Sequence, residues 1–294
     1  MSYSAENSLQ SKLHGDDLTQ AVAKSLYVLP TDEQERKRLA VQYEVLRHGF
    51  GGRVVFAPIE LHAGDKVLDS GVGSATWLLD CYNANKDVNF HGIDLKTNIF
   101  PELDDIQKQR IHLGPGNILQ LPNDWTSNFQ LVNQRLLIAA LSKEMWNTVV
   151  DEIFRVLAPG GWVQLLEASH CSAGEVTQRH FSMLQDLFVK RGLLLNCIEH
   201  IPNVLKSAGF DNITAQRLEI SLGGGEDEDG MEAKARESFI GAYKGMQTPV
   251  VKMGIRTEGE YVKLMEDLER EWETNAQSKV VFYTFVAQKP TASA

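Results

Sequence analysis

The 294-residue sequence is poor in cysteine and has no surplus of positive charge. Its three cysteines, Cys81, Cys171 and Cys197, are far apart and lack Cys-x-x-Cys spacing, so they predict neither a disulfide framework nor a zinc site. The 29 Lys and Arg residues are outnumbered by 39 Asp and Glu residues, which gives a formal net charge of −10. Because binding to a phosphate backbone depends on basic side chains, we expect no nucleic-acid partner, and we expect no metal site.

Long apolar runs are also missing. No stretch approaches the roughly 18 uncharged apolar residues of a membrane span, and the polar start MSYSAENSLQ lacks the basic and apolar regions of a secretory signal. We therefore expect a protein without membrane contact, located in the cytoplasm or the nucleus. With 43% hydrophobic and 23% charged residues, the composition is that of a globular protein with a sizeable core.

Strands and helices are expected to alternate from residue 66 onward. The strand-like segments of the first half are KVLDS, VNFHGIDL, IHLGPGN, FQLVNQRLL and GGWVQLLEA. Helices are expected between them at about 75–84 and 143–157, and a short segment at about 102–109. This alternation predicts βαβ units and a parallel sheet. The second half predicts helices at about 174–191, 199–208, 232–246 and 258–273, and a final strand KVVFYTFVAQK that closes the sheet beside NITAQRLEISL.

The segment VLDSGVGSATW, residues 67–77, reads as a strand, a glycine turn and the start of a helix. Gly71 and Gly73 allow a backbone to approach a ligand closely. A dinucleotide fingerprint counted from Gly71 needs a third glycine where Thr76 stands, which weakens a nicotinamide interpretation. A G-x-G-x-G pattern is missed only by the methyl group of Ala75. The turn therefore favours a different adenosine ligand.

Three polar residues follow the predicted parallel strands, where open α/β sheets bind ligands. Asp94 lies 23 residues beyond Gly71, where a carboxylate can accept both ribose hydroxyl protons; the alternative is a helix N-cap. Asp69 ends the first strand and either contacts the amino group of a ligand or braces the glycine turn. Asn117 follows the third strand and either meets an adenine edge or is a plain turn asparagine.

These segments resemble the class I S-adenosylmethionine-dependent methyltransferases, and within them the fungal LaeA-like and UMTA-like group. The core resemblance runs over about residues 65–168 through VLDSGVGSATW, GIDL, GNILQLPND and IFRVLAPGGWVQLLE. A narrower one lies in YVLPTDEQERKRLAVQYEVL followed by GGRVVFAPI. The resemblance implies an α/β fold with a Rossmann-like, doubly wound sheet of seven strands in the order 3-2-1-4-5-7-6, strand 7 being antiparallel.

The resemblance also implies a domain plan and a lid. Residues 1–60 are expected to form an N-terminal helical lid, and residues 61–294 a methyltransferase domain with a helical cap inserted at about 222–275 before the last strand. Tyr27, Arg38 and Gln42 lie in the lid segment, which would close over the cofactor and exclude water. The alternative is that Tyr27 is a core residue and Arg38 a surface residue.

The cofactor implied by the resemblance is S-adenosylmethionine. By position, its amino acid part would be held by Asp69, Gly71 and Gly73, its ribose by Asp94, and its adenine by Asn117 and Ile118; Arg135, at the end of the fourth strand, would border the methyl-transfer space. The sequence departs from the family pattern at three positions: Ala75 in place of glycine, Asn117 where aspartate is usual, and Asn133 where the subgroup often has histidine.

Methyl transfer from a sulfonium is an in-line displacement, to which orientation contributes effective molarities of about 10⁵–10⁸ M and a general base about 10²–10⁴-fold. If the acceptor is a phenol, His170 directly after the fifth strand is the best-placed base, and Glu167 would orient it or bind substrate. The alternative for His170 is an exposed loop histidine. His180 and His200, in the expected cap region, are further candidates.

The leading hypothesis is a fungal methyltransferase that acts on a small aromatic or secondary metabolite, most simply by O-methylation of a phenolic hydroxyl. One alternative is a LaeA-like regulator that acts through protein partners. Another is a cofactor-binding catalyst that transfers no methyl group, for example a cyclase that uses the sulfonium as a fixed charge. A nicotinamide dehydrogenase is the remaining alternative.

Overall fold

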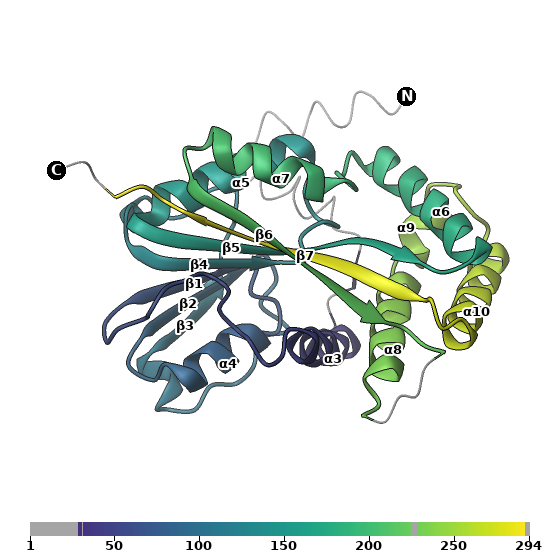
Figure 1. The fold of residues 1–294 in the computed structure, drawn as a ribbon, viewed down its shortest axis with the longest axis horizontal. Helices are drawn as coiled ribbons and strands as arrows, with labels where there is room; N and C mark the ends of the chain where they lie inside the picture. Colours follow the sequence, from purple (N-terminus) through teal and green to yellow (C-terminus); the bar gives the residue numbers. More distant parts are fainter. Residues whose placement is uncertain (1–28, 31, 225–228, 292–294) are drawn as a thin grey trace.

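A seven-stranded sheet runs through the computed structural model, which describes residues 29–30, 32–224 and 229–291 (Figure 1). The strand order is β3-β2-β1-β4-β5-β7-β6. Strands β1 to β5 pair in parallel, and β7 is antiparallel to both β5 and β6, which confirms the predicted topology. The strands are β1 Lys66–Ser70, β2 Asn89–Asp94, β3 Ile111–Pro115, β4 Phe129–Arg135, β5 Leu157–Ser172, β6 Asp211–Ser221 and β7 Lys279–Gln288.

Helices lie on both sides of the sheet and beyond one of its ends (Figure 1). They are α3 Glu33–Gly49, α4 Thr76–Ala84, α5 Lys143–Val156, α6 Glu175–Arg191, α7 Cys197–Ser207, α8 Met231–Lys244, α9 Gln247–Lys252 and α10 Glu258–Thr274. Two single 3₁₀ turns are η1 Gln107–Gln109 and η2 Asn123–Trp125. The expected short segment near 102–109 contains the 3₁₀ turn η1, and α9 was not predicted.

The middle of the sheet is covered by α4 on one face and by α5 and α7 on the other. Helix α5 shows how the sequence specifies this. Its N-cap Ser142 accepts a hydrogen bond from Met145 N over 3.2 Å, and its apolar side chains recur at helical spacing. These side chains are all buried, and they are Trp146, Val149, Val150, Ile153 and Val156.

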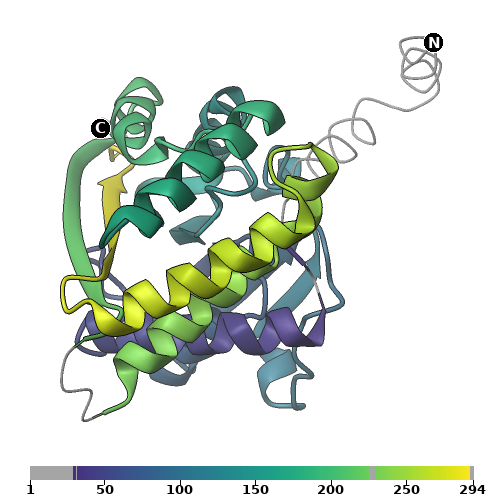
Figure 2. The same cartoon turned by 90° about the vertical axis from the view of Figure 1, so that its right-hand side faces the viewer.

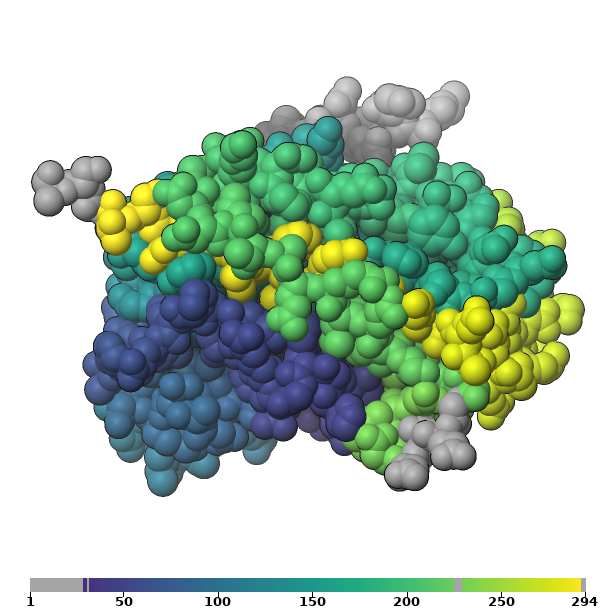
Figure 3. Space-filling view, viewed as in Figure 1, coloured from purple at the N-terminus to yellow at the C-terminus, as the bar shows by residue number. Residues whose placement is uncertain are grey.

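A separate core lies where α3, α6, α8 and α10 pack around the far ends of β5 and β7. Figure 2 shows α10, α8 and α3 crossing the view side by side. In the space-filling view the purple atoms of the α3 segment separate the blue α4 region from the green and yellow cap (Figure 3). The predicted cap insert therefore shares its apolar core with α3 and α6.

Helix α3 is joined to the cap through Arg38, which also forms a buried ion pair within α3. Arg38 Nε lies 2.7 Å from Glu35 Oε2, the two side chains are 9% and 4% exposed, and Arg38 Nη1 donates to the Ser238 carbonyl of α8 over 3.3 Å. The alternative that places Arg38 on the surface is therefore wrong. The division into a lid over residues 1–60 and a domain over 61–294 stays a prediction.

Candidate active site

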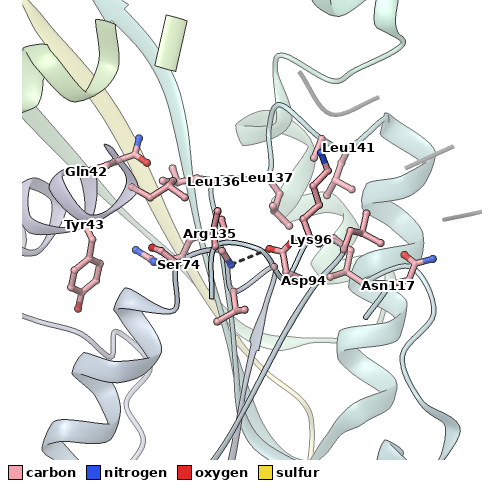
Figure 4. A pocket seen from close by; sticks show the side chains of 18 of the residues that line it. Gln42, Tyr43, Ser74, Asp94, Lys96, Asn117, Arg135, Leu136, Leu137 and Leu141 are labelled. Carbon is pink, nitrogen blue, oxygen red and sulfur yellow. Dashed lines mark hydrogen bonds between the residues drawn. The ribbon is translucent and has the colours of Figure 1, made fainter. Parts of the chain in front are cut away.

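A cavity opens at the carboxyl ends of the parallel strands, where ligands bind in open α/β sheets (Figure 4). Its empty volume is about 1140 Å³ including the open mouth. The lining comes from α3, from the loops after β1, β2, β3 and β4, and from the start of α5. The lining residues are Leu39, Gln42, Tyr43, Leu46, Gly71, Val72, Gly73, Ser74, Asp94, Leu95, Lys96, Ile99, Asn117, Ile118, Leu119, Arg135, Leu136, Leu137, Ala140, Leu141 and Met145.

The glycine turn after β1 forms one wall of the cavity. Gly71 and Gly73 have φ of +75° and +54°, which side chains other than glycine rarely adopt. A Cβ on Gly71 would also lie only 3.2 Å from Leu137 Cδ1. Ala75 has φ of +57° and is fully buried. The cost of replacing the third glycine is therefore backbone strain rather than the space taken by a methyl group.

Asp94 braces this turn from across the cavity. Its Oδ2 accepts a hydrogen bond from Gly73 N over 3.0 Å and its Oδ1 one from Lys96 N over 3.0 Å, and Figure 4 shows the first of these bonds. Burial raises the pKa of Asp94, although the backbone hydrogen bonds lower it. The residues after β2 form a loop, so the alternative of a helix N-cap is wrong. Each carboxylate oxygen keeps a second lone pair for a ligand.

Asp69 lies just below the turn, in a row of polar side chains that crosses three strands. Asn133 Nδ2 donates to Asp69 Oδ1 over 2.7 Å, and Gln164 Nε2 donates to Asn133 Oδ1 over 2.8 Å. Burial raises the pKa of Asp69 to about 6, although the charge of Arg135 and the Asn133 bond lower it. Because Asn133 is buried and holds Asp69, this position supplies no base.

Arg135 projects from the end of β4 into the wall between the sheet and α3. Its guanidinium carbon lies 5.0 Å from the centre of the Tyr43 ring, and the Tyr43 hydroxyl donates to Asp80 Oδ2 over 2.5 Å. Burial lowers the pKa of Arg135, while the charge of Asp69 raises it. Within the described parts of the chain, Arg135 Nε and Asp69 Oδ2 are buried without a hydrogen-bond partner. Buried polar atoms of this kind are costly unless a ligand or water pairs with them.

Asn117 and Ile118 both line the cavity on the side of β3. Asn117 Oδ1 accepts a hydrogen bond from Leu119 N over 3.0 Å, so the residue forms the local turn that its alternative interpretation expects while facing the cavity. Tyr27, which was expected in the lid, lies outside the described residues. Gln42 of the same predicted lid is a lining residue.

The two expected catalytic residues are not brought to the cavity, as far as the described residues define its lining. Glu167 is fully buried, and its carboxylate accepts hydrogen bonds from Leu137 N over 2.8 Å and Ile138 N over 3.0 Å. His170 is exposed near the end of β5, with Nδ1 3.0 Å from Ser169 Oγ. His170 therefore lies where the alternative interpretation, an exposed loop histidine, places it.

The other two histidine candidates also lie away from the lining. His180 is buried in α6 with its ring centre 4.2 Å from that of Tyr243, and burial lowers its pKa to about 3. His200 Nε2 lies 2.9 Å from Asn147 Oδ1. Among the described residues, no histidine lines the cavity.

Sequence reasoning did not anticipate the part of the cavity formed by the loop after β4. Leu136 has φ of +58° although it is not glycine, and it lines the cavity together with Leu137, Leu141 and Met145. A leucine gives no sign of a left-handed backbone, so the sequence offers no signal for it. Leu39 and Leu46, by contrast, belong to an apolar stripe of α3 that can be recognised from spacing alone.

Neither a membrane-spanning helix nor a metal-binding cluster is found among the described residues. No helix there is long and apolar enough to cross a membrane. No group of three or more His, Cys, Asp or Glu side chains there is arranged to hold a metal ion.

Comparison with known proteins gives a family and relatives. A family model described as a methyltransferase domain matches residues 67–161. The chain is 29% identical over 245 residues to the N-methyltransferase verN of Clonostachys rogersoniana, covering 80% of this chain and 82% of that protein. It is 28% identical over 152 residues to the secondary metabolism regulator LAE1 of Cochliobolus heterostrophus, covering 49% of this chain and 46% of that protein.

A solved structure shares the fold. It is phosphoethanolamine N-methyltransferase 2 of Haemonchus contortus in complex with phosphomonomethylethanolamine and S-adenosylhomocysteine, with a TM-score of 0.50 and 17% sequence identity. The match covers 90% of this chain but 55% of that one. The sheet order and the glycine turn agree with these matches. The chain therefore contains a methyltransferase domain at residues 67–161 and is similar to class I S-adenosylmethionine-dependent methyltransferases and to the fungal LaeA-like group.

Proposed function

We propose that the cavity binds S-adenosylmethionine and that the chain transfers its methyl group to a nitrogen atom of a small, largely apolar secondary metabolite. The observation that carries this proposal is the pair of buried, unpartnered atoms, Asp69 Oδ2 and Arg135 Nε, beside the glycine turn. The cofactor has an ammonium group and a carboxylate at its amino acid end. The Asp69 carboxylate suits the ammonium group, and the Arg135 guanidinium suits the carboxylate.

The remaining cavity residues also fit this cofactor. Gly71 and Gly73 carry no side chains and so leave room for the amino acid part. A side chain at Gly71 would also press against Leu137. Asp94 presents two carboxylate oxygens with free lone pairs to a ribose diol. Asn117 and Ile118 would hold adenine, one by its edge and one by its face. These assignments keep the cofactor roles expected from the sequence with two exceptions: Arg135 moves from the border of the methyl-transfer space to the cofactor carboxylate, and Tyr27 is left without a role.

The chain contributes mainly positioning and exclusion of water. When bound, the cofactor supplies an electrophilic methyl group on a positively charged sulfur. Leu39 and Leu46 of α3 and Leu136 after β4 form apolar walls on the same cavity, which would orient an apolar acceptor and keep water out. Helix α3 is held to the body by the Tyr43–Asp80 hydrogen bond and by the Arg47–Asp80 ion pair at 2.6 Å.

A nitrogen acceptor is favoured over a phenol by the absence of histidine from the described lining. A phenol needs its proton removed near neutral pH, whereas a neutral amine already carries the lone pair that attacks the methyl carbon. Burial raises the pKa of Tyr43 well above its usual value, so its hydroxyl stays protonated and does not act as a base. The relative verN is named an N-methyltransferase. O-methylation of a phenol with His170 as base stays a prediction.

The test uses purified protein, methyl-labelled S-adenosylmethionine, and acceptors matched in shape that differ only in carrying an amine or a hydroxyl on the same aromatic ring. Label on the amine members is expected. Label confined to the hydroxyl members would overturn the nitrogen assignment, and failure to bind S-adenosylhomocysteine in calorimetry would overturn the cofactor site.

A regulatory function is the second candidate, favoured by the match to LAE1. In that case the same cavity would bind the cofactor while the relevant acceptor or partner is a protein. Including a fungal protein extract in the labelling experiment distinguishes the two, since label would then appear on protein and on none of the small acceptors. Binding of the cofactor with no labelled product in any fraction would instead favour catalysis without methyl transfer.

A further inference from the structure

Glu167 lies directly behind the wall of the cavity that the loop after β4 forms. Its side chain is fully buried, and its two carboxylate oxygens accept hydrogen bonds from consecutive backbone amides, Leu137 N and Ile138 N. No basic side chain pairs with it among the described residues. Two successive amides that converge on one anion form a small anion-binding concavity, which here is filled by a side chain of the same protein.

The residue before these amides is strained. Leu136 has φ of +58°, a conformation that is unfavourable for a residue other than glycine and persists only where neighbouring contacts impose it. Leu136 N donates to the Leu166 carbonyl over 2.8 Å, so the loop is held to β5 at Leu136 and again by Glu167. The held backbone turns the Leu136 side chain into the cavity wall.

The loop in turn contacts the glycine turn. A Cβ placed on Gly71 would lie 3.2 and 3.3 Å from the two terminal methyl carbons of Leu137, so Leu137 already packs against the backbone of that turn. A continuous path of contacts therefore runs from the Glu167 carboxylate through the Leu137 amide and side chain to Gly71. It joins β5 to the loop that follows β1.

We propose that Glu167 is a positioning residue of the cofactor cavity: its carboxylate fixes the strained Leu136–Ile138 loop, and the loop holds Leu137 against the glycine turn. It neither carries a proton to substrate nor orients His170. The proposal rests on the cofactor site proposed above. It adds that the affinity of this site depends on a carboxyl group that lies outside the cavity.

The chain offers a closely matched control in Glu271. Its carboxylate likewise accepts two consecutive backbone amides, Val176 N over 2.9 Å and Thr177 N over 2.8 Å, but at the start of α6, away from the cavity lining. Glu167→Gln and Glu271→Gln both replace one acceptor oxygen by an NH₂ group that faces a backbone N–H. Glu271 additionally accepts a hydrogen bond from Thr177 Oγ1 over 2.6 Å. The comparison therefore controls for the loss of an acceptor to a pair of backbone amides.

The experiment measures binding of S-adenosylhomocysteine by calorimetry and thermal unfolding for wild type, Glu167→Gln and Glu271→Gln. We expect both variants to lose stability and Glu167→Gln alone to lose affinity, by fivefold or more. Equal affinities for the two variants would overturn the proposal, while wild-type binding would leave the proposed cofactor site intact. Absence of binding by wild type would instead refute that site.

A double-mutant cycle adds a readout that a general loss of stability does not move. Leu136→Gly removes the strain that Glu167 is proposed to maintain, so Glu167→Gln should reduce affinity less in a Leu136→Gly background than in wild type. Independent effects of the two substitutions would count against the proposal. If Glu167→Gln does not fold, Glu167→Asp, which withdraws the carboxylate by one methylene, takes its place in the same cycle.

The pH dependence of binding supplies a further check. Burial raises the pKa of Glu167 to about 8, although its two amide bonds lower it. The titratable group that senses its charge is Cys197 at the start of α7, a buried thiol whose pKa is raised well above its usual value. Because the ionised carboxylate accepts both amide bonds, wild type should gain affinity relative to Glu167→Gln between pH 7 and 9. A constant ratio of the two affinities would contradict the positioning role.

Discussion

Asn133 Nδ2 donates a hydrogen bond to Asp69 Oδ1 over 2.7 Å between residues that are directly paired in β4 and β1. The direction of this bond is fixed, because Asn133 Oδ1 already accepts from Gln164 Nε2 and Gln164 Oε1 accepts from Phe56 N over 2.9 Å. The row therefore begins at a backbone amide and ends at a carboxylate. It leaves Asp69 Oδ2 buried without a hydrogen-bond partner among the described residues.

Replacing Asn133 should weaken cofactor binding, and more at low pH. Burial raises the pKa of Asp69 to about 6 and the Asn133 bond lowers it, so Asn133→Ala raises that pKa further. Asp69 is then more protonated near pH 6 and attracts an ammonium group less. Calorimetry with S-adenosylhomocysteine should show a larger loss of affinity at pH 6 than at pH 8. Asn147→Ala, at an exposed site of α5, is the control. A loss independent of pH would show that Asn133 acts only through packing.

Replacing Asp94 should reduce cofactor affinity about 10- to 100-fold, because hydrogen bonds to a charged group contribute about 1.5–3 kcal/mol each. Asp94→Asn is preferable to Asp94→Ala, since the amide keeps one oxygen for the Gly73 or Lys96 N–H. Asp104→Asn is the matched control, because that carboxylate also accepts two backbone amides, from Ile106 and Gln107, but lies outside the cavity lining. An affinity within twofold of wild type would show that Asp94 does not hold the ribose.

The glycine turn should tolerate a methyl group at Gly71 poorly, for two separable reasons. Gly71→Ala places a side chain at φ of +75° and presses its Cβ against Leu137. Gly64→Ala imposes a comparable backbone strain at φ of +90°, but its Cβ would meet no described heavy atom within 4 Å. We expect each to lower the free energy of unfolding by about 1 kcal/mol through strain, and Gly71→Ala alone to weaken binding of S-adenosylhomocysteine. If both variants bind equally well, the Leu137 contact does not shape the cavity.

The individual strands and the glycine turn could be predicted because they leave short-range signals, whereas the order of the strands was implied by the resemblance to the methyltransferases. The 3.6-residue spacing of α5 and the glycines at 71 and 73 reflect local backbone and burial requirements that few other folds satisfy in that order. Asp94 and Arg135 were placed correctly at the cavity because strand ends can be read from the sequence, and strand ends in a parallel sheet meet at one edge.

The surroundings of Glu167 and His170, the two expected catalytic residues, could not be predicted because distant segments of the chain form them. Glu167 follows an apolar strand as a catalytic carboxylate would, yet its partners are amides about 30 positions earlier in the chain. His170 is only three residues further, but β5 is irregular between Ala168 and Cys171 and leaves His170 exposed. Neither the direction of a side chain after an irregular strand end nor the left-handed Leu136 is encoded in local spacing.

The two carboxylates that hold backbone amides should give stability profiles of opposite slope. Burial raises the pKa of Glu167 to about 8, so its stabilising contribution is present below the ordinary pKa of about 4.5 and is lost as the pH rises through 8. For Glu271, burial raises the pKa, but the bonds from Thr177 and Val176 outweigh this effect and lower it overall. Its contribution is present above the ordinary pKa and is lost as the pH falls through the lowered value.

Thermal unfolding of wild type, Glu167→Gln and Glu271→Gln between pH 4 and 9 checks this prediction. The difference in stability by which wild type exceeds Glu167→Gln should shrink as the pH rises from 5 to 9. The reason is that the glutamine side chain stays neutral while the buried glutamate must ionise. The advantage over Glu271→Gln should instead shrink as the pH falls below 5. Parallel profiles for the two variants would mean that burial does not control the ionisation of Glu167. The carboxylate would then be charged throughout, and the affinity of the cavity would lose the dependence on pH that is expected between 7 and 9.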